Sequence, residues 1–200
     1  AGQTERVRKM LLAFSRDLRV VLLRLASRLQ TLRWFAAGRR ECPQPIAREA
    51  LQVFAPLANR LGIWQIKWEM EDLSFRFLQP QDYKRVASLL DGKRAERERE
   101  VEAARRRLAV ALAARGIRAE VRGRPKHLYS IWKKMQGKKL DFERVQDVRA
   151  LRVIVSTVPD CYAALSRVHE IYRALPGEFD DYIARPKANG YQSLHTVVQD

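Results

Sequence analysis

The sequence predicts a helical segment followed by an α+β or α/β domain. In the first half, apolar residues recur at spacings of three and four, which is the period of amphipathic helices. After Gly116, short runs alternate apolar with polar residues or are rich in Leu, Val and Ile, which is typical of β-strands. The chain has 200 residues, 46% of them hydrophobic, which is enough to bury real cores. We therefore expect most of the chain to be folded.

The helical half divides into several predicted helices. An apolar stripe from Leu11 to Leu32 predicts a helix over 10–32. Because this pattern has no visible start signal, we expect further residues upstream. Gly38 and the stretch 43–45 break the chain, and 46–78 predicts two helices hinged near Gly62. A short helix is predicted over 82–90. A long helix is predicted over 93–115, with Glu102 and Arg106 as a favourable pair four residues apart.

The second half is predicted to contain, in order, a strand, a helix, a strand, a helix and a strand. We predict strands over 117–122, 150–155 and 193–198 and helices over 127–135 and from Pro159 to about Arg173. The run 150–155 is typical of a buried strand. This order of elements indicates α+β or α/β after an all-helical segment.

Charge and cysteine content narrow the class of protein. The 39 Lys and Arg residues exceed the 23 Asp and Glu residues, so the net charge is +16. That charge favours polyanionic partners: nucleic acid, nucleotide phosphates or an acidic membrane surface. No apolar run approaches the length of a membrane span, and the start of the chain is not a signal peptide, so we expect a cytoplasmic protein without membrane contact. Cys42 and Cys161 belong to no metal or redox motif and are predicted to be reduced thiols, with Cys161 in a helix core.

Two basic segments, residues 123–131 and 184–196, flank Asp147 and the acidic run 178–181. Each segment sets Pro and Gly among cations, aromatic rings and hydroxyls, which are the groups that bind phosphate and stack on a base. Carboxylates between such cations are expected to bind a divalent metal. The pattern predicts a site for two polyphosphates beside a metal ion.

In the first basic segment, Arg124 and Lys126 fall where a strand ends and a helix begins. A helix start adds partial positive charge and free N–H groups. Ser130 and Lys134 lie four apart and share one face, along which a triphosphate could bind, while Arg124 could stack on a purine. The alternative is a basic surface turn before a capped helix.

The second basic segment offers different chemistry. Lys187 is a point charge, Asn189 and Gln192 can bind polar edges, and Tyr191 presents a flat face to a base. His195 follows at the start of a strand, where it could bond a phosphate or a ribose hydroxyl. We expect this segment to bind a nucleotide.

Asp147 precedes the predicted buried strand, where a carboxylate needs a partner. Mg²⁺ with phosphate oxygens is one possible partner, and Arg149 or Arg152 is another. A structural salt bridge remains the alternative to a metal site.

Three separated motifs resemble one family. GRPKHLYSIWKKM at 123–135, DVRALRV at 147–153 and DYIARPKANGYQSLHT at 181–196 closely resemble the synthetase domain of RelA/SpoT-family alarmone enzymes. The likeness covers about 116–200, and the helical part resembles the region that precedes it. The resemblance implies the C-terminal part of a degenerate HD-type hydrolase domain over 1–80 and a helical connector over 81–115. It also implies a nucleotidyltransferase-like mixed β-sheet with flanking helices over 116–200, truncated at its C-terminal side.

The implied reaction is pyrophosphoryl transfer from ATP to the 3′-hydroxyl of GTP or GDP, giving (p)ppGpp and AMP. The resemblance assigns the adenine to Arg124 and Arg149 and the ATP phosphates to Lys126, Ser130, Lys134 and Arg152. It assigns Mg²⁺ to Asp147, guanine stacking to Tyr191, and further acceptor contacts to Lys187, Asn189, Gln192 and His195. The implied catalytic group is Asp147, Lys126, Lys134 and Arg152. Ribosome and tRNA are implied as partners of regions C-terminal to this chain.

Two departures from the family pattern refine this expectation. Bifunctional members carry Arg-x-Lys-Asp where this chain has 178–181, which resembles the synthesis-only RelA branch. The carboxylates of Glu178, Asp180 and Asp181 could recruit a second metal or set acceptor preference. Functional hydrolases have Asp and Asn where Ser27 and Thr31 stand, and neither substitute is a good Mn²⁺ ligand, so hydrolysis is predicted to be absent.

The resemblance also implies a catalytic Glu on a strand beyond Asp200, so weak or no turnover is expected of the 200 residues alone. The alternative function is an RNA-binding module that uses the positive charge and stacks bases on Tyr129, Trp132 and Tyr191.

Overall fold

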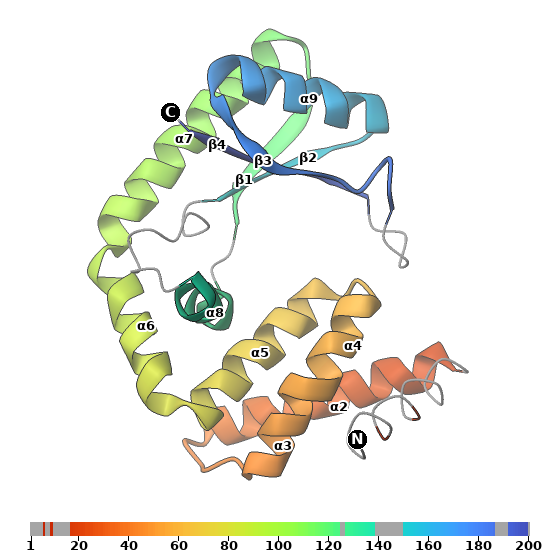
Figure 1. Cartoon of the computed structure of the whole chain (residues 1–200), viewed down its shortest axis with the longest axis vertical. Helices are drawn as coiled ribbons and strands as arrows, with labels where there is room; N and C mark the ends of the chain where they lie inside the picture. The colour runs from red at the N-terminus through yellow and green to blue at the C-terminus, as the bar shows by residue number, and fades with distance from the viewer. Residues whose placement is uncertain are drawn as a thin grey trace. The chain divides into compact units, whose positions relative to one another are not determined.

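The computed structural model describes residues 6, 9, 17–124, 127–138, 150–186 and 192–199 (Figure 1). Contacts divide the chain into two units, each made of two stretches. The first unit takes 1–89 and 127–142, and the second takes 90–126 and 143–200. The helical first part and the small sheets with helices that follow confirm the α+β class. The domain boundaries predicted at 80 and 115 stay predictions.

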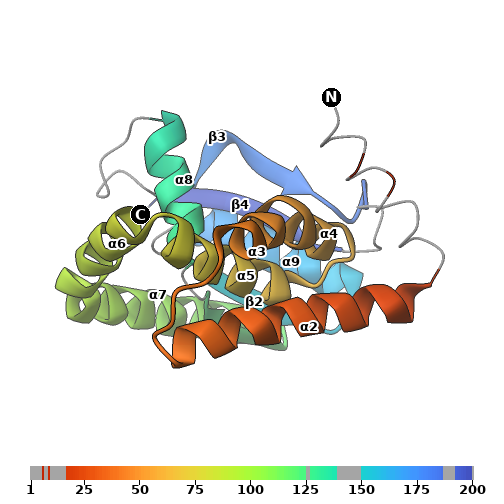
Figure 2. The same ribbon diagram turned by 90° about the horizontal axis from the view of Figure 1, so that it is seen from below.

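The first unit is a helical bundle. Its elements are α2 Leu18–Ala37, α3 Gln44–Glu49, η1 Ala50–Phe54, α4 Ala55–Arg60, α5 Trp64–Leu78, most of α6 Pro80–Gly92, and α8 Leu128–Lys138. The stripe Val21, Leu25, Leu29 and Leu32 of α2 is buried in one cluster with residues of α3, η1, α4 and α5. Figure 2 shows α2 running alongside these helices. The predicted helix therefore exists, but it continues to Ala37.

The start of α2 corrects the sequence analysis, which found no start signal. Asp17 is the N-cap, with extended backbone, and its Oδ1 accepts a hydrogen bond of 3.0 Å from the Arg19 N–H. Asp is a preferred N-cap because its side chain satisfies an N–H that has no partner within the helix. The residue was overlooked because it lies inside the apolar pattern.

Residues 44–60 form one continuous helical run with a wide turn in its middle. The Ala55 N–H bonds the carbonyl of Ala50, five residues back, and the π-helical stretch Ala50–Phe54 results. Pro56 follows directly and has no N–H to donate, so it leaves a ladder bond unmade. The predicted hinge near Gly62 is confirmed, because Gly62 has a φ of +74° and separates α4 from α5.

The second unit begins with α7 Arg94–Ala114 and continues with β1 Ala119–Gly123, β2 Leu151–Val155 and α9 Val158–Ile171. Strands β1 and β2 pair antiparallel, with Val121 opposite Val153. One face of this pair packs against α7 and α9 around Leu108, Leu112 and Ala164. On the other face, as far as the described residues show, Ile154 is 42% exposed and Arg152 is exposed. The prediction of a buried strand was therefore wrong, because within the described stretches the residues of β2 alternate between half-buried and exposed.

The second unit also contains β3 Arg173–Asp181, which pairs antiparallel with β4 Leu194–Gln199. The strand β3 was not predicted. Pro176, Gly177 and the acidic run are poor strand formers, and the pairing is irregular between Ala174 and Phe179. Gly177 has a φ of +77°, which a residue with a side chain adopts only with strain. Every strand pair in the described stretches is antiparallel, so a mixed sheet stays a proposal.

Two composition-based expectations can be compared with the structure. Cys42 and Cys161 are free thiols, and burial raises the pKa of both. Within the described residues, no helix is long and apolar enough to cross a membrane.

Candidate nucleotide-binding site

The first basic segment is divided between the two units. Arg124 directly follows β1 in the second unit, where its N–H donates to the Ala150 carbonyl at 2.9 Å. Lys126 lies outside the described residues. Ser130 and Lys134 are half-buried and lie one turn apart on α8 in the first unit. Their spacing on a helix places them on one face, as the sequence analysis expected.

The beginning of α8 corrects one expectation. Free N–H groups were expected there for a phosphate, but Asp72 of α5 accepts two of them. Its Oδ2 is 3.3 Å from the Leu128 nitrogen and its Oδ1 is 3.0 Å from the Tyr129 nitrogen. The carboxylate occupies the place that an anion would take, so this helix start is an internal contact.

The region around Asp147 is described only in part. Asp147 and Arg149 lie outside the described residues, so their predicted roles remain predictions. Arg152 is exposed on β2, on the opposite face from the cluster that packs on α7 and α9. It lies across from Arg122 of β1, whose guanidinium pairs with Glu120. Arg152 therefore presents a cation on the face of the β1–β2 pair opposite α7 and α9.

The second basic segment surrounds the end of β4. Lys187, Asn189 and Tyr191 lie outside the described residues. Gln192 is exposed just before the strand. His195 is exposed on β4, and its ring meets that of Tyr182 edge to face at 5.3 Å.

The acidic run lies on β3, and its three carboxylates are not equivalent. Asp181 accepts hydrogen bonds from the Ala184 and Ile183 N–H groups at 2.8 and 2.9 Å and from the Tyr162 hydroxyl at 2.8 Å. These bonds, led by the Ala184 N–H, hold the pKa of Asp181 below its ordinary value. Asp181 therefore shapes the turn after β3.

Glu178 and Asp180, by contrast, are exposed, and Asp180 lies directly across from His195. Thr196, the next residue on β4, is bonded to His169 of α9 at 2.8 Å. Because side chains alternate along a strand, His195 and Asp180 belong to the face turned away from α9. They provide an acid and an imidazole side by side.

No metal centre forms within the described stretches. There, no three His, Cys, Asp or Glu side chains come together as a possible metal site. The carboxylate predicted to bind Mg²⁺, Asp147, is outside those stretches. Of the acidic run, Glu178 and Asp180 are exposed, whereas the Asp181 oxygens accept three hydrogen bonds.

The two residues predicted to replace hydrolase metal ligands, Ser27 and Thr31, lie on α2. Ser27 is exposed, and the Thr31 hydroxyl donates to the Ser27 carbonyl at 3.0 Å within the same helix. Both side chains end in a hydroxyl, and Thr31 uses its proton in a local bond. Neither offers the carboxylate or amide oxygen expected at these positions.

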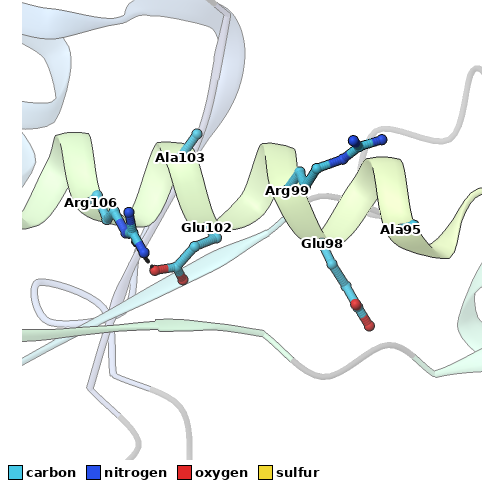
Figure 3. A pocket seen from close by; sticks show the side chains of 6 residues that line it. All are labelled: Ala95, Glu98, Arg99, Glu102, Ala103 and Arg106. Carbon is cyan, nitrogen blue, oxygen red and sulfur yellow. Dashed lines mark hydrogen bonds and ion pairs between the residues drawn. The ribbon is translucent and has the colours of Figure 1, made fainter.

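A shallow hollow on α7 is unrelated to the predicted site (Figure 3). It is lined by Ala95, Glu98, Arg99, Glu102, Ala103 and Arg106, all from this one helix. The predicted pair of Glu102 with Arg106 is confirmed at 2.9 Å, and Arg105 binds the same carboxylate at 2.7 Å. The bonds from Arg105 and then Arg106 lower the pKa of Glu102 to about 2. The hollow is a charged, solvated helix face.

Sequence reasoning missed Asp72. A usable signal was present, because Trp68, Asp72 and Phe75 follow one another at spacings of four and three and so share one face of α5. Trp68 and Phe75 are buried. A carboxylate between two buried aromatic residues needs a partner, and the α8 N–H groups provide it.

Two family models match the chain. One, described as a region found in RelA / SpoT proteins, matches 123–200, and the other, an HD domain, matches 1–64. The first range contains both basic segments, and the second contains α2, α3 and α4. The two models place an HD domain before a RelA/SpoT region, in the order that the sequence analysis expected.

Individual relatives match almost the whole chain. A GTP pyrophosphokinase of Escherichia coli is 52% identical over 196 residues, which is 98% of this chain and 26% of the relative. A GTP pyrophosphokinase of Photobacterium angustum is 50% identical over 99% of the chain and 27% of the relative. A Synechocystis protein named probable guanosine-3′,5′-bis(diphosphate) 3′-pyrophosphohydrolase is 48% identical over 98% of the chain and 26% of the relative. Residues 123–200 match the RelA/SpoT family, and the chain spans about a quarter of the length of these curated relatives.

Proposed function

We propose that this chain is the nucleotide-binding part of a (p)ppGpp synthetase of the RelA type. The observation that carries the proposal is 52% identity to a GTP pyrophosphokinase along 98% of the chain, including the RelA/SpoT region at 123–200. The substrates are ATP and GTP or GDP, which the net charge of +16 suits. A cytoplasmic location belongs to the same proposal, because ATP and GTP are cytoplasmic substrates.

The proposed reaction needs little covalent chemistry from the protein. The acceptor 3′-oxygen attacks the β-phosphorus of ATP, the bond from that phosphorus to the bridging oxygen of the α-phosphate breaks, AMP leaves, and the hydroxyl proton passes to a base. Catalysis of such a transfer is mostly positioning and charge neutralisation. We assign the base to a Glu beyond Asp200, in a longer protein of which this chain is a part.

The proposed ATP side consists of cations and one hydroxyl. Ser130 and Lys134, on one face of α8, and Arg152, exposed on β2, support the assignment by their placement. The full proposed set is Arg124, Lys126, Ser130, Lys134, Arg149 and Arg152.

The proposed acceptor side is the end of the β3–β4 pair. His195 on β4 and the exposed Gln192 support it, and Asp180 beside His195 is a candidate for acceptor selectivity. The full proposed set is Lys187, Asn189, Tyr191, Gln192 and His195, with Glu178, Asp180 and Asp181 as the acidic selectivity residues.

Mg²⁺ is the proposed metal. When bound it would neutralise charge on the transferring phosphates. Asp147 is the proposed ligand, and Glu178 and Asp180 fit a metal by their exposure and their carboxylate oxygens.

We further propose that the helical part is a hydrolase domain without hydrolase activity, because Ser27 and Thr31 offer only hydroxyls. Because the Synechocystis relative is named a hydrolase, the hydrolase activity of this protein has to be measured. The proposed domain division is 1–80 for the HD remnant, 81–115 for the connector and 116–200 for a synthetase domain built on a nucleotidyltransferase-like mixed sheet.

The test measures synthesis and hydrolysis in the full-length protein that contains this chain. We expect (p)ppGpp synthesis without (p)ppGpp hydrolysis, and Asp147→Asn should lower synthesis by about 100-fold or more, as does the loss of a preorganised electrostatic group. Asp91→Asn, at an exposed position on α6, is the matched control and should leave synthesis unchanged. Normal synthesis by Asp147→Asn would remove that residue from the site.

Titration calorimetry separates the synthetase from the RNA-binding alternative, which the charge of +16 keeps open. A non-hydrolysable ATP analogue with Mg²⁺ is compared with a short single-stranded RNA. Tight, salt-sensitive RNA binding together with no nucleotide heat would reject the synthetase.

A further inference from the structure

A carboxylate on α5 determines where α8 begins. The first N–H groups of a helix have no partner within the helix, and Asp72 accepts those of Leu128 and Tyr129 at 3.3 and 3.0 Å. Capping residues usually lie immediately before the helix they cap. Here the cap lies 56 residues earlier in the sequence. The bond therefore both starts α8 and joins it to α5.

Aromatic packing beside Asp72 sets the rotation of α8 about its axis. The His127 ring stacks on Trp68, with centroids 4.4 Å apart and planes 19° apart. Phe75 lies three residues after Asp72, on the same face of α5. Its ring centroid is 5.7 Å from that of Tyr129 and 5.0 Å from that of Trp132. Trp68 and Phe75, on either side of Asp72 along α5, therefore pack against His127 and against one face of α8.

The rotation decides where the proposed ATP residues point. At about 100° per residue, the mean direction of Ser130 and Lys134 is about 150° around the helix from that of Tyr129 and Trp132. Fixing the aromatic side against α5 therefore directs Ser130 and Lys134 to nearly the opposite side. Since two of the helix-start N–H groups are occupied, phosphate contacts at α8 depend on these side chains.

We propose that Asp72 is a positioning residue for the ATP side of the site, acting through the beginning and rotation of α8. The role rests on the proposed function. Asp72 touches no substrate in this proposal; its loss lets the first turn of α8 fray and misplaces Ser130 and Lys134.

The test compares three variants of the full-length protein, Asp72→Ala, Asp72→Asn and Asp82→Ala. Asp72→Ala should lower kcat/KM for ATP by roughly 10- to 100-fold, the effect of a misplaced substrate-binding group, with KM for GTP nearly unchanged. Asp72→Asn keeps one acceptor oxygen, which suffices for the Tyr129 N–H, but it replaces the other oxygen with an NH2 group that cannot accept from Leu128, so it should restore part of the loss. Asp82→Ala is the control, because Asp82 pairs at 3.2 Å with Arg85 on its own helix and should change neither constant.

Amide hydrogen exchange supplies a readout that does not depend on activity. In Asp72→Ala, exchange at Tyr129 should accelerate by roughly 2- to 30-fold, as expected for a lost helix cap. Unchanged ATP kinetics in Asp72→Ala would overturn the proposal. Equal losses toward ATP and GTP would overturn it as well, since they indicate only a general loss of folded protein, and so would an Asn variant as impaired as the Ala variant. A wild-type protein that makes no product would reject the proposed function and the ATP role together, and the exchange data would still show whether the cap exists.

Discussion

Replacement of Phe75 by Ala should strongly destabilise the first unit. Phe75 is 1% exposed on α5. Its ring lies 5.8, 5.7 and 5.0 Å from those of Tyr83, Tyr129 and Trp132, which belong to α6 and α8. Loss of the ring removes contacts to two other helices at once.

The magnitude follows from burial and from the ring pairs. Truncating a buried Phe to Ala costs about 3–5 kcal/mol, including the cavity left behind. Aromatic pairs contribute about 0.5–1.5 kcal/mol each beyond their buried area, and Phe75 makes three, so we expect the upper half of that range. Since domains are stable by about 5–15 kcal/mol, the variant should lose between a quarter and nearly all of its stability.

Urea unfolding followed by tryptophan fluorescence measures this loss. Trp132 is a direct reporter, because its ring centroid is 5.0 Å from that of Phe75. Phe179→Ala makes the same chemical change at a side chain that is 46% exposed and should cost less than about 1 kcal/mol. If Phe75→Ala costs no more than Phe179→Ala, the idea that α5, α6 and α8 share a core around Phe75 is refuted.

Two further predictions concern carboxylates whose pKa values are shifted. Burial raises the pKa of Glu71 above its ordinary value of 4.5, although Lys67 lies 3.2 Å away. The contribution of Glu71 to stability is therefore present below pH 4.5 and lost as the pH rises through its pKa in the folded protein. Glu71→Gln should raise the free energy of unfolding at pH 7 by a few tenths to about 1 kcal/mol, allowing for solvent screening, and by less at pH 4. The pKa of Asp181 is lowered, so its contribution to stability is present above pH 3.8 and is lost as the pH falls through its pKa in the folded protein. Asp181→Ala should therefore accelerate amide exchange at Ala184 at neutral pH, and the difference from the wild type should disappear in acid.

Each of these predictions has a matched control. For Glu71, thermal unfolding of Glu69→Gln should show no stabilisation, because Glu69 is an exposed partner of Arg33. A Glu71→Gln variant that is less stable at pH 7 would mean that the Lys67 pair outweighs burial. For Asp181, Asp180→Ala should leave exchange at Ala184 unchanged; if both variants accelerate it equally, the turn does not depend on the Asp181 carboxylate.

Local periodicity predicted the elements well wherever one face of the element packs. The stripe of α2, the hinge at Gly62, the α7 pair and the strands β1, β2 and β4 all follow from spacing. Each of these features depends only on residues that are close together in the sequence, within about one helical turn or one strand.

The features that were missed depend on pairing or contact across the sequence. Strand β3 is held by its hydrogen bonds to β4, although Pro176 and Gly177 argue locally against a strand. The cap of α8 depends on Asp72, 56 residues away, and no local pattern at the start of α8 could reveal it. In the predicted site, residue types suggested the chemistry, and the roles of all its residues remain predictions.

The discontinuous first unit has a consequence for synthesis of the chain. Asp72 leaves the ribosome 56 residues before Leu128, an interval of roughly 3–11 s at ordinary translation rates. During that time the side of α5 that carries Trp68 and Phe75 lacks the helix that later covers it. The nascent bundle then presents an aromatic surface of the kind that chaperones bind. A stall in translation between α5 and α8 should therefore prolong chaperone association with the half-made protein.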